Sequence, residues 1–149
     1  MKTVHTGAGG PIPSGATRSF TVETSGKFNQ FSVVTMLVNT NDAFTGLDSL
    51  RLRGHGSSRE TMACDAGSER NNELKSHIPG PCCGNPFIRD PEGALIAPHE
   101  GITGRGQLSP ALYDWNGAAA RITIERASYP MEERRTRETS LARLECSRL

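Results

Sequence analysis

The chain is poor in apolar and aromatic residues and close to neutral in charge. Hydrophobic residues make up 35% of its 149 residues and aromatic residues 5%, and no run approaches the roughly 20 apolar residues that a membrane-spanning helix requires. The net charge of +1 gives no global positive field of the kind that nucleic-acid-binding proteins use. The sequence therefore argues against a transmembrane segment and against a nucleic-acid partner.

Signals for export and for two common enzyme classes are also missing. Residues 1–15 carry one lysine and no apolar core, so no signal peptide is visible. No G-x-S-x-G motif of a serine hydrolase occurs, and the glycine-rich stretch 6–14 lacks the G-x-x-x-x-G-K-[ST] pattern of a phosphate-binding loop. Neither a serine hydrolase nor a P-loop protein is supported.

Cysteine is scarce, and its spacing defines neither a compartment nor a metal site. The four cysteines are Cys64, Cys82, Cys83 and Cys146, with no C-x-x-C pair among them. Cys82 and Cys83 are adjacent and cannot easily provide two ligands to one tetrahedral zinc ion. We expect buried or free thiols; the alternatives are a disulfide from Cys64 to Cys82 or Cys83, and a zinc site.

Short apolar runs separated by glycine and proline predict strands rather than helices. The segment 31–38 is a near-continuous apolar run rich in β-branched residues, and we expect a strand covered on both faces. Residues 20–23 alternate and, through a turn at 25–26, predict a hairpin with that strand. Residues 119–126 form the clearest alternating strand of the chain. The predicted fold is all-β, an antiparallel β-sandwich.

The chain divides into one domain, 6–127, and a charged tail, 128–149. In the tail, Leu141 and Leu144 are three residues apart but no apolar face continues, so we expect disorder or a short helix. Within the domain, residues 70–93 are rich in proline and glycine and read as a long loop. Loops of this length are often functional when they are ordered.

Three carboxylates lie in loops that border predicted strands: Asp42, Asp65 and Glu69. If the strands that carry Asp42 and Asp65 end at the same rim, the three groups repel one another unless a divalent cation compensates. Calcium is the best candidate because it takes 6–8 oxygen ligands, whereas zinc prefers His or Cys and magnesium demands stricter geometry. Acidic loop residues also commonly cap turns, so the pattern alone is compatible with a structural role.

Five linked motifs occur in order along the chain. They are MLVNTNDAFTGL (36–47), CDAGSERNNEL (64–74), HIPGP (77–81), HEGITGRGQLSP (99–110) and DWNGAAARITIER (114–126). Together they resemble the spondin domain family, particularly its stand-alone microbial versions, over about residues 6–127. The resemblance implies a β-sandwich similar to calcium-dependent lipid-binding domains, with a calcium ion held at one end by three acidic side chains. Those positions fall on Asp42, Asp65 and Glu69.

The resemblance also implies an extracellular or cell-surface module that recognises or adheres to an unknown ligand. The chain departs from the family in three places. Strands expected before residue 17 are lacking, Cys64 replaces the aromatic residue that commonly precedes the Asp-Ala-Gly motif, and the tail after residue 127 has no counterpart. A truncated product that keeps the fold without function is therefore one hypothesis.

The main hypothesis is a non-enzymatic calcium-binding module. An alternative of a different class is a metal-dependent hydrolase that uses the same acidic rim, with His77 or His99 as the base. The position of these two histidines relative to Asp42 and Asp65 discriminates between them. Trp115, the single tryptophan, is expected to anchor the core or the rim next to the last predicted strand.

Overall fold

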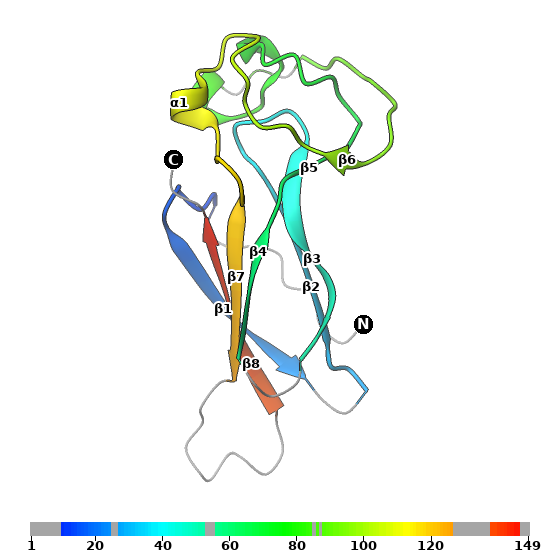
Figure 1. Ribbon diagram of the computed structural model, residues 1–149, viewed down its shortest axis with the longest axis vertical. Helices are drawn as coiled ribbons and strands as arrows, with labels where there is room; N and C mark the ends of the chain where they lie inside the picture. The colour runs from blue at the N-terminus through cyan, green and yellow to red at the C-terminus, as the bar shows by residue number, and fades with distance from the viewer. Residues whose placement is uncertain are drawn as a thin grey trace.

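The computed structural model describes residues 10–24, 27–52, 56–84, 86, 88–126 and 138–146. Within these residues the chain forms two four-stranded sheets, and every strand pairing is antiparallel (Figure 1). The helical segments found there are about one turn long, and none is long and apolar enough to cross a membrane. The all-β prediction is confirmed.

The first sheet has the order β1-β8-β7-β4. Its strands are β1 (Thr17–Thr24), β8 (Glu138–Cys146), β7 (Ala120–Arg126) and β4 (Ser57–Thr61). The predicted hairpin of the first two strands is wrong, because β1 pairs with β8 and the next strand belongs to the other sheet. Phe20 of β1 and Phe31 instead meet with their ring centroids 6.2 Å apart. Because the chain crosses from one sheet to the other between these residues, the two aromatic rings pack against each other in the core.

The second sheet has the order β2-β3-β5-β6. Its strands are β2 (Gln30–Met36), β3 (Ala43–Arg51), β5 (Cys64–Asp65) and β6 (Ala97–Pro98). The prediction that the apolar run in β2 is covered on both faces is wrong. Phe31 is buried, but Val34 is 70% exposed and Met36 51% exposed. Since this antiparallel sheet packs on the core with one face, the side chains of β2 that point to the other face are exposed.

The predicted disordered or helical tail is wrong for residues 138–146, which form strand β8 between β1 and β7. The register places Ala142 opposite Ile124 and Leu144 opposite Ile122. These alternating positions have the period of a strand, but the three-residue spacing of Leu141 and Leu144 conceals it. The other tail residues, 127–137 and 147–149, lie outside the described residues.

The main core draws on both sheets. Its buried residues are Phe31 of β2 and Ala120, Ile122 and Ile124 of β7, and half-buried side chains of β1 and β3 pack around them. The alternating prediction for 119–126 is confirmed, since the outward positions of β7 are more exposed than these three. Burying a side chain such as Ile122 contributes about 1.5–3 kcal/mol, so β7 is the central element of the domain.

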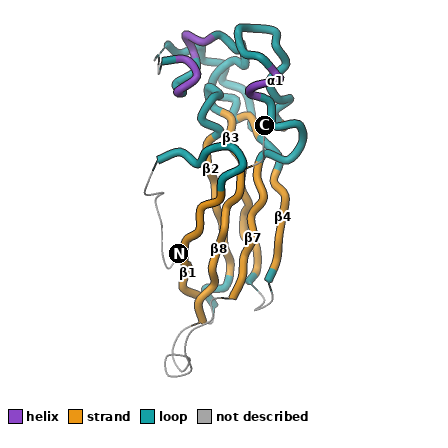
Figure 2. The backbone as a smooth tube through the Cα atoms, turned by 90° about the vertical axis from the view of Figure 1, so that its left-hand side faces the viewer, coloured by secondary structure: helices purple, strands orange, loops and turns teal. Residues whose placement is uncertain are grey.

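Long loops gather at one end of the sheets (Figures 1 and 2) and have a small hydrophobic core of their own. They include η1 (Lys75–His77) and η2 (Pro81–Cys83), in accord with the predicted loop at 70–93, and α1 (Pro110–Tyr113) further along the chain. The second core consists of Ile78, Ile102 and Leu108, and Trp115 packs against it. The prediction of Trp115 as an anchor is thereby confirmed. This loop end is where the predicted site residues lie.

Candidate functional site

The turn between β2 and β3 places Asp42 at the loop end. The Thr40 hydroxyl donates to the Leu37 carbonyl oxygen at 2.6 Å and accepts the Ala43 N–H at 3.1 Å. The Leu37 N–H in turn donates to the Ala43 carbonyl oxygen at 2.9 Å. Asp42 is only 8% exposed as a result, so its carboxylate has little contact with solvent.

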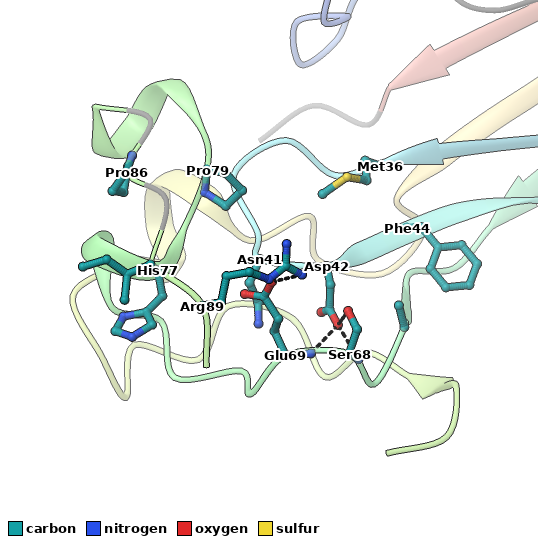
Figure 3. Close-up of a pocket in the computed structure, with 12 residues that line it drawn as sticks. Met36, Asn41, Asp42, Phe44, Ser68, Glu69, His77, Pro79, Pro86 and Arg89 are labelled. Carbon is teal, nitrogen blue, oxygen red and sulfur yellow. Dashed lines mark hydrogen bonds and ion pairs between the residues drawn. The ribbon is translucent and has the colours of Figure 1, made fainter. Parts of the chain in front are cut away.

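The two oxygens of Asp42 have unequal surroundings (Figure 3). Oδ2 accepts hydrogen bonds from the N–H and the hydroxyl of Ser68, both at 2.8 Å, and from the N–H of Glu69 at 2.9 Å. Oδ1 is buried and has no hydrogen-bond partner. A buried carboxylate oxygen without a donor is costly, which makes Oδ1 the first candidate ligand for a cation.

Asp65 accepts hydrogen bonds from the loop 65–71, which also donates hydrogen bonds to Asp42. It lies on β5 opposite Ala43, and its Oδ1 accepts the Gly67 N–H at 2.7 Å. Its Oδ2 accepts from the side-chain amide of Asn71 at 2.6 Å, while the Asn71 Oδ1 is buried without a partner. Asn71 was not among the predicted site residues. The run Arg70-Asn71-Asn72 after the Asp-Ala-Gly motif is the sequence signal for it, because a loop amide oxygen is also a hard donor.

Glu69 already has a cationic partner. It is 5% exposed, and its Oε1 lies 2.5 Å from Nη2 of Arg89 (Figure 3). This cation comes from a loop twenty residues further along the chain than Glu69. Among the described residues, no group of three or more His, Cys, Asp or Glu side chains is arranged to hold a metal ion.

A pocket of about 440 Å³ opens beside Asp42 and Glu69. Its volume falls within the 300–1,000 Å³ typical of small-molecule sites. The apolar part of the wall comes from β2, β3 and the loops, and the polar part from the acidic rim (Figure 3). The lining residues are Met36, Asn41, Asp42, Phe44, Ala66, Ser68, Glu69, His77, Pro79, Pro86, Ile88 and Arg89.

The two histidines of the alternative hypothesis have different positions. His77 lines the pocket together with Asp42 and Glu69, and its Nδ1 lies 2.9 Å from the Ser76 hydroxyl. His99 packs against Trp115 with ring centroids 5.2 Å apart, and its Nδ1 accepts the Gly101 N–H at 3.0 Å. Only His77 borders the pocket.

Burial shifts the pKa of His99. Burial of the ring lowers its pKa below the ordinary value of 6.5, and the charges of Asp65 and Asp42 oppose this in part. The neutral form of His99 is therefore favoured near neutral pH. This form leaves Nδ1 free to accept the Gly101 N–H.

Glu73 is a buried carboxylate that the sequence argument did not select. It is 7% exposed; its Oε1 accepts from the Thr103 N–H at 2.6 Å and the Thr103 hydroxyl at 2.7 Å, and its Oε2 accepts from the Gly106 N–H at 3.2 Å. Burial raises the pKa of Glu73, but these hydrogen bonds outweigh it, so the pKa lies below the usual 4.5. The role that this geometry supports is structural: Glu73 holds the loop 101–107.

The cysteine expectations need correction. Cys82 and Cys83 form a disulfide with each other, so they are not free thiols, and neither pairs with Cys64. Cys64 is a free thiol on β5. The side chain of Cys146 lies outside what the structure describes. A disulfide between adjacent cysteines is unusual, because most disulfides join residues whose Cα atoms are about 4.4–6.8 Å apart.

No protein-family model matches the chain, and no curated protein or solved structure matches it either.

Proposed function

We propose that the chain is a non-enzymatic calcium-binding module whose site is the acidic rim around Asp42 and Asp65. The observation that carries the proposal is the buried Oδ1 of Asp42, which has no hydrogen-bond donor. The Oδ1 of Asn71 is also buried without a hydrogen-bond partner, and the side-chain N–H of Asn71 donates a hydrogen bond to Asp65. Oxygens of this kind are the donors that calcium prefers.

The charge of the rim supports a cation. Asp42 and Asp65 accept hydrogen bonds from neutral N–H and O–H groups, and no basic side chain in the described part of the chain pairs with either of them. Asp42 is buried and Asp65 half-buried, and a carboxylate removed from water without a counter-charge is costly. A divalent ion would supply that charge and join the turn 37–42 to the loop 65–71.

Glu69 has a different place in this proposal. Its Oε1 is paired with Arg89, so its charge is already compensated. Asp42, Asp65 and Asn71 are the residues that would hold the ion, and Glu69 would join them only by exchanging its guanidinium partner. The resemblance to spondin domains favours that exchange, because it implies three acidic ligands.

The biological role follows from the resemblance rather than from the site. A calcium ion would order two loops at one end of the domain, so that a partner meets a rigid surface. We propose recognition or adhesion outside the cell or at its surface. Extracellular calcium modules bind the ion with a Kd of roughly 10⁻⁴–10⁻³ M, which is the affinity we expect.

The test is thermal unfolding of the chain in chelator and in millimolar calcium. At ten times Kd, a ligand that binds only the folded state stabilises by roughly 1.4 kcal/mol. We expect this gain in the wild type and its loss in Asp65→Asn. The matched control is Asp48→Asn, which removes an exposed carboxylate of β3 away from the rim and should retain the gain. A cooperative transition that ignores calcium in the wild type would refute the proposal.

The second candidate, a metal-dependent hydrolase, has one observation in its favour. His77 lines the same pocket as Asp42 and Glu69, where it could act as a base toward a metal-bound water. Its test is hydrolysis of ester and phosphoester substrates by the calcium-loaded chain. Activity that His77→Ala abolishes while the calcium-dependent stabilisation persists would favour the enzyme over the recognition module.

A further inference from the structure

The disulfide between Cys82 and Cys83 closes almost no loop of chain. The residues are neighbours, their Cα atoms are 3.8 Å apart, and the described residues include no cis peptide bond. A disulfide stabilises the folded state by restricting the unfolded chain, and this effect grows with the length of the loop it closes, so the Cys82–Cys83 bond contributes little in that way. A role other than stapling the fold is therefore the better explanation.

Neighbouring cysteines also form a disulfide that is easier to reduce than most. Ordinary disulfides join Cα atoms about 4.4–6.8 Å apart, and departures from this range favour reduction. Both residues are half-buried rather than fully enclosed. Exposed or constrained disulfides are typically the labile ones.

The pair is part of the wall of the loop end. Both cysteines pack against the second core of Ile78, Ile102 and Leu108, which Trp115 also contacts. The preceding Gly80 lies so close to the turn 37–42 that a Cβ there would be 2.3 Å from the Val38 carbonyl oxygen. The segment therefore fits tightly against the turn that ends at Asp42, and Pro79 and Pro86, on either side of the two cysteines, line the pocket beside it (Figure 3).

We propose that Cys82–Cys83 is a thiol–disulfide exchange site whose reduction changes the packing of this loop end. The reductant is a dithiol or a pair of small thiols. A reductant thiolate attacks one sulfur, the Cys82–Cys83 bond breaks, and the leaving thiolate takes a proton. A second reductant thiolate then attacks the mixed disulfide and releases the other cysteine as a thiol. Two electrons and two protons pass to the protein, and the reductant leaves as a disulfide.

The first test maps the thiols of the folded chain in glutathione buffers of graded ratio. Free thiols are alkylated, the remaining disulfides are reduced and labelled with a second reagent, and the chain is cut with trypsin. Both cysteines fall in one peptide, 76–89, whereas Cys64 and Cys146 fall in the separate peptides 60–70 and 144–148. A small secreted protein with structural disulfides serves as the internal standard.

Under oxidising conditions we expect peptide 76–89 to carry none of the first alkylating reagent. At glutathione ratios that leave the disulfides of the standard unreduced, we expect both cysteines of the peptide to carry it. Free thiols under oxidising conditions would overturn the proposal, and so would a bond that is reduced only with the standard or after unfolding. Cys64→Ser should leave the result unchanged.

The second test follows the fluorescence of Trp115, the single tryptophan, during the same titration. Because Trp115 shares a core with the two cysteines, we expect its emission to change with the same midpoint as the labelling. The double variant Cys82→Ser/Cys83→Ser should show no response to the reductant. An emission that stays constant while the bond is fully reduced would refute the conformational part of the proposal.

Discussion

Ser68 donates two hydrogen bonds to one oxygen of Asp42, through its backbone N–H and its hydroxyl, each 2.8 Å long. Asp42 ends the turn after β2, and Ser68 lies 26 residues later in the loop after β5. This contact therefore joins the two acidic motifs without any metal ion. It also leaves the other carboxylate oxygen of Asp42 directed away from these donors.

Replacing Asp42 should destabilise the chain even in chelator. Asp42→Ala leaves the N–H groups of Ser68 and Glu69 without their acceptor, and hydrogen bonds to a charged group contribute about 1.5–3 kcal/mol. Ser68→Ala is the matched control, because it removes only one of the three hydrogen bonds to the carboxylate, so we expect a smaller loss than for Asp42→Ala. Urea unfolding with chelator present measures both. Equal losses would contradict the assigned hydrogen bonds.

Glu73→Gln should lower the free energy of unfolding at neutral pH by about 1.5–3 kcal/mol. The amide places an N–H donor where the carboxylate accepts from Thr103 or Gly106. The pKa of Glu73 is lower in the folded state than its ordinary 4.5. Its contribution is therefore present above pH 4.5 and lost as the pH falls through the lower folded value.

The measurement for Glu73 is the free energy of unfolding from pH 7 to pH 3, in the wild type and the variant. The two curves should converge at the acid end. Glu92→Gln, at an exposed position of the neighbouring loop, is the control and should follow the wild type. A constant gap between the Glu73→Gln curve and that of the wild type would refute the ionised, hydrogen-bonded state of Glu73.

Local patterns predicted the strands better than the pairing between them. Ile122 and Ile124 alternate with polar residues, and this period alone identified β7. The partner of β1 could not be predicted from its own turn, because β8 lies more than a hundred residues further along the chain. Val34 and Met36 were expected to be buried because composition does not reveal that only one face of the β2 sheet is covered.

Local patterns also predict only part of the candidate site. The acidic residues could be selected because each follows a strand end, and the structure ties Asp42 and Asp65 to one loop. Arg89 and Asn71 could not be selected in that way. The guanidinium of Arg89 reaches Glu69 across a long loop, and Asn71 differs from a turn-capping asparagine only through its contact with Asp65. Such contacts arise from tertiary packing, which spacing along the chain does not encode.

Acidification below pH 6.5 should destabilise the chain through His99. The pKa of His99 is lower in the folded state than the ordinary 6.5, because burial disfavours the charged ring. Its contribution to stability is present above pH 6.5 and is lost as the pH falls through the folded value. Protonation of Nδ1 also removes the hydrogen bond from the Gly101 N–H.

The fluorescence of Trp115 reports this step, since the two rings are in contact. We expect emission to fall on acidification with a midpoint below pH 6.5, and His99→Gln to remove the transition. His77→Gln is the matched control, because His77 lies elsewhere in the loop end, beside the pocket. A transition that survives His99→Gln would show that another group is responsible.

Alanine substitutions at two glycines of the loop end distinguish the cost of backbone strain from the cost of steric overlap. Gly67 has φ +69° and Gly93 has φ +71°, so alanine at either position costs roughly 1–2 kcal/mol in a left-handed conformation. A Cβ at Gly93 meets no atom within 4 Å, whereas at Gly67 it would lie 2.6 Å from the Ala94 carbonyl oxygen. Gly67→Ala should therefore destabilise the chain more than Gly93→Ala in urea unfolding. Since both variants carry the same strain, the difference measures how tightly the segment after Gly93 packs on the Asp-Ala-Gly motif. Equal losses would mean that this packing is loose and that Gly67 is required for its φ alone.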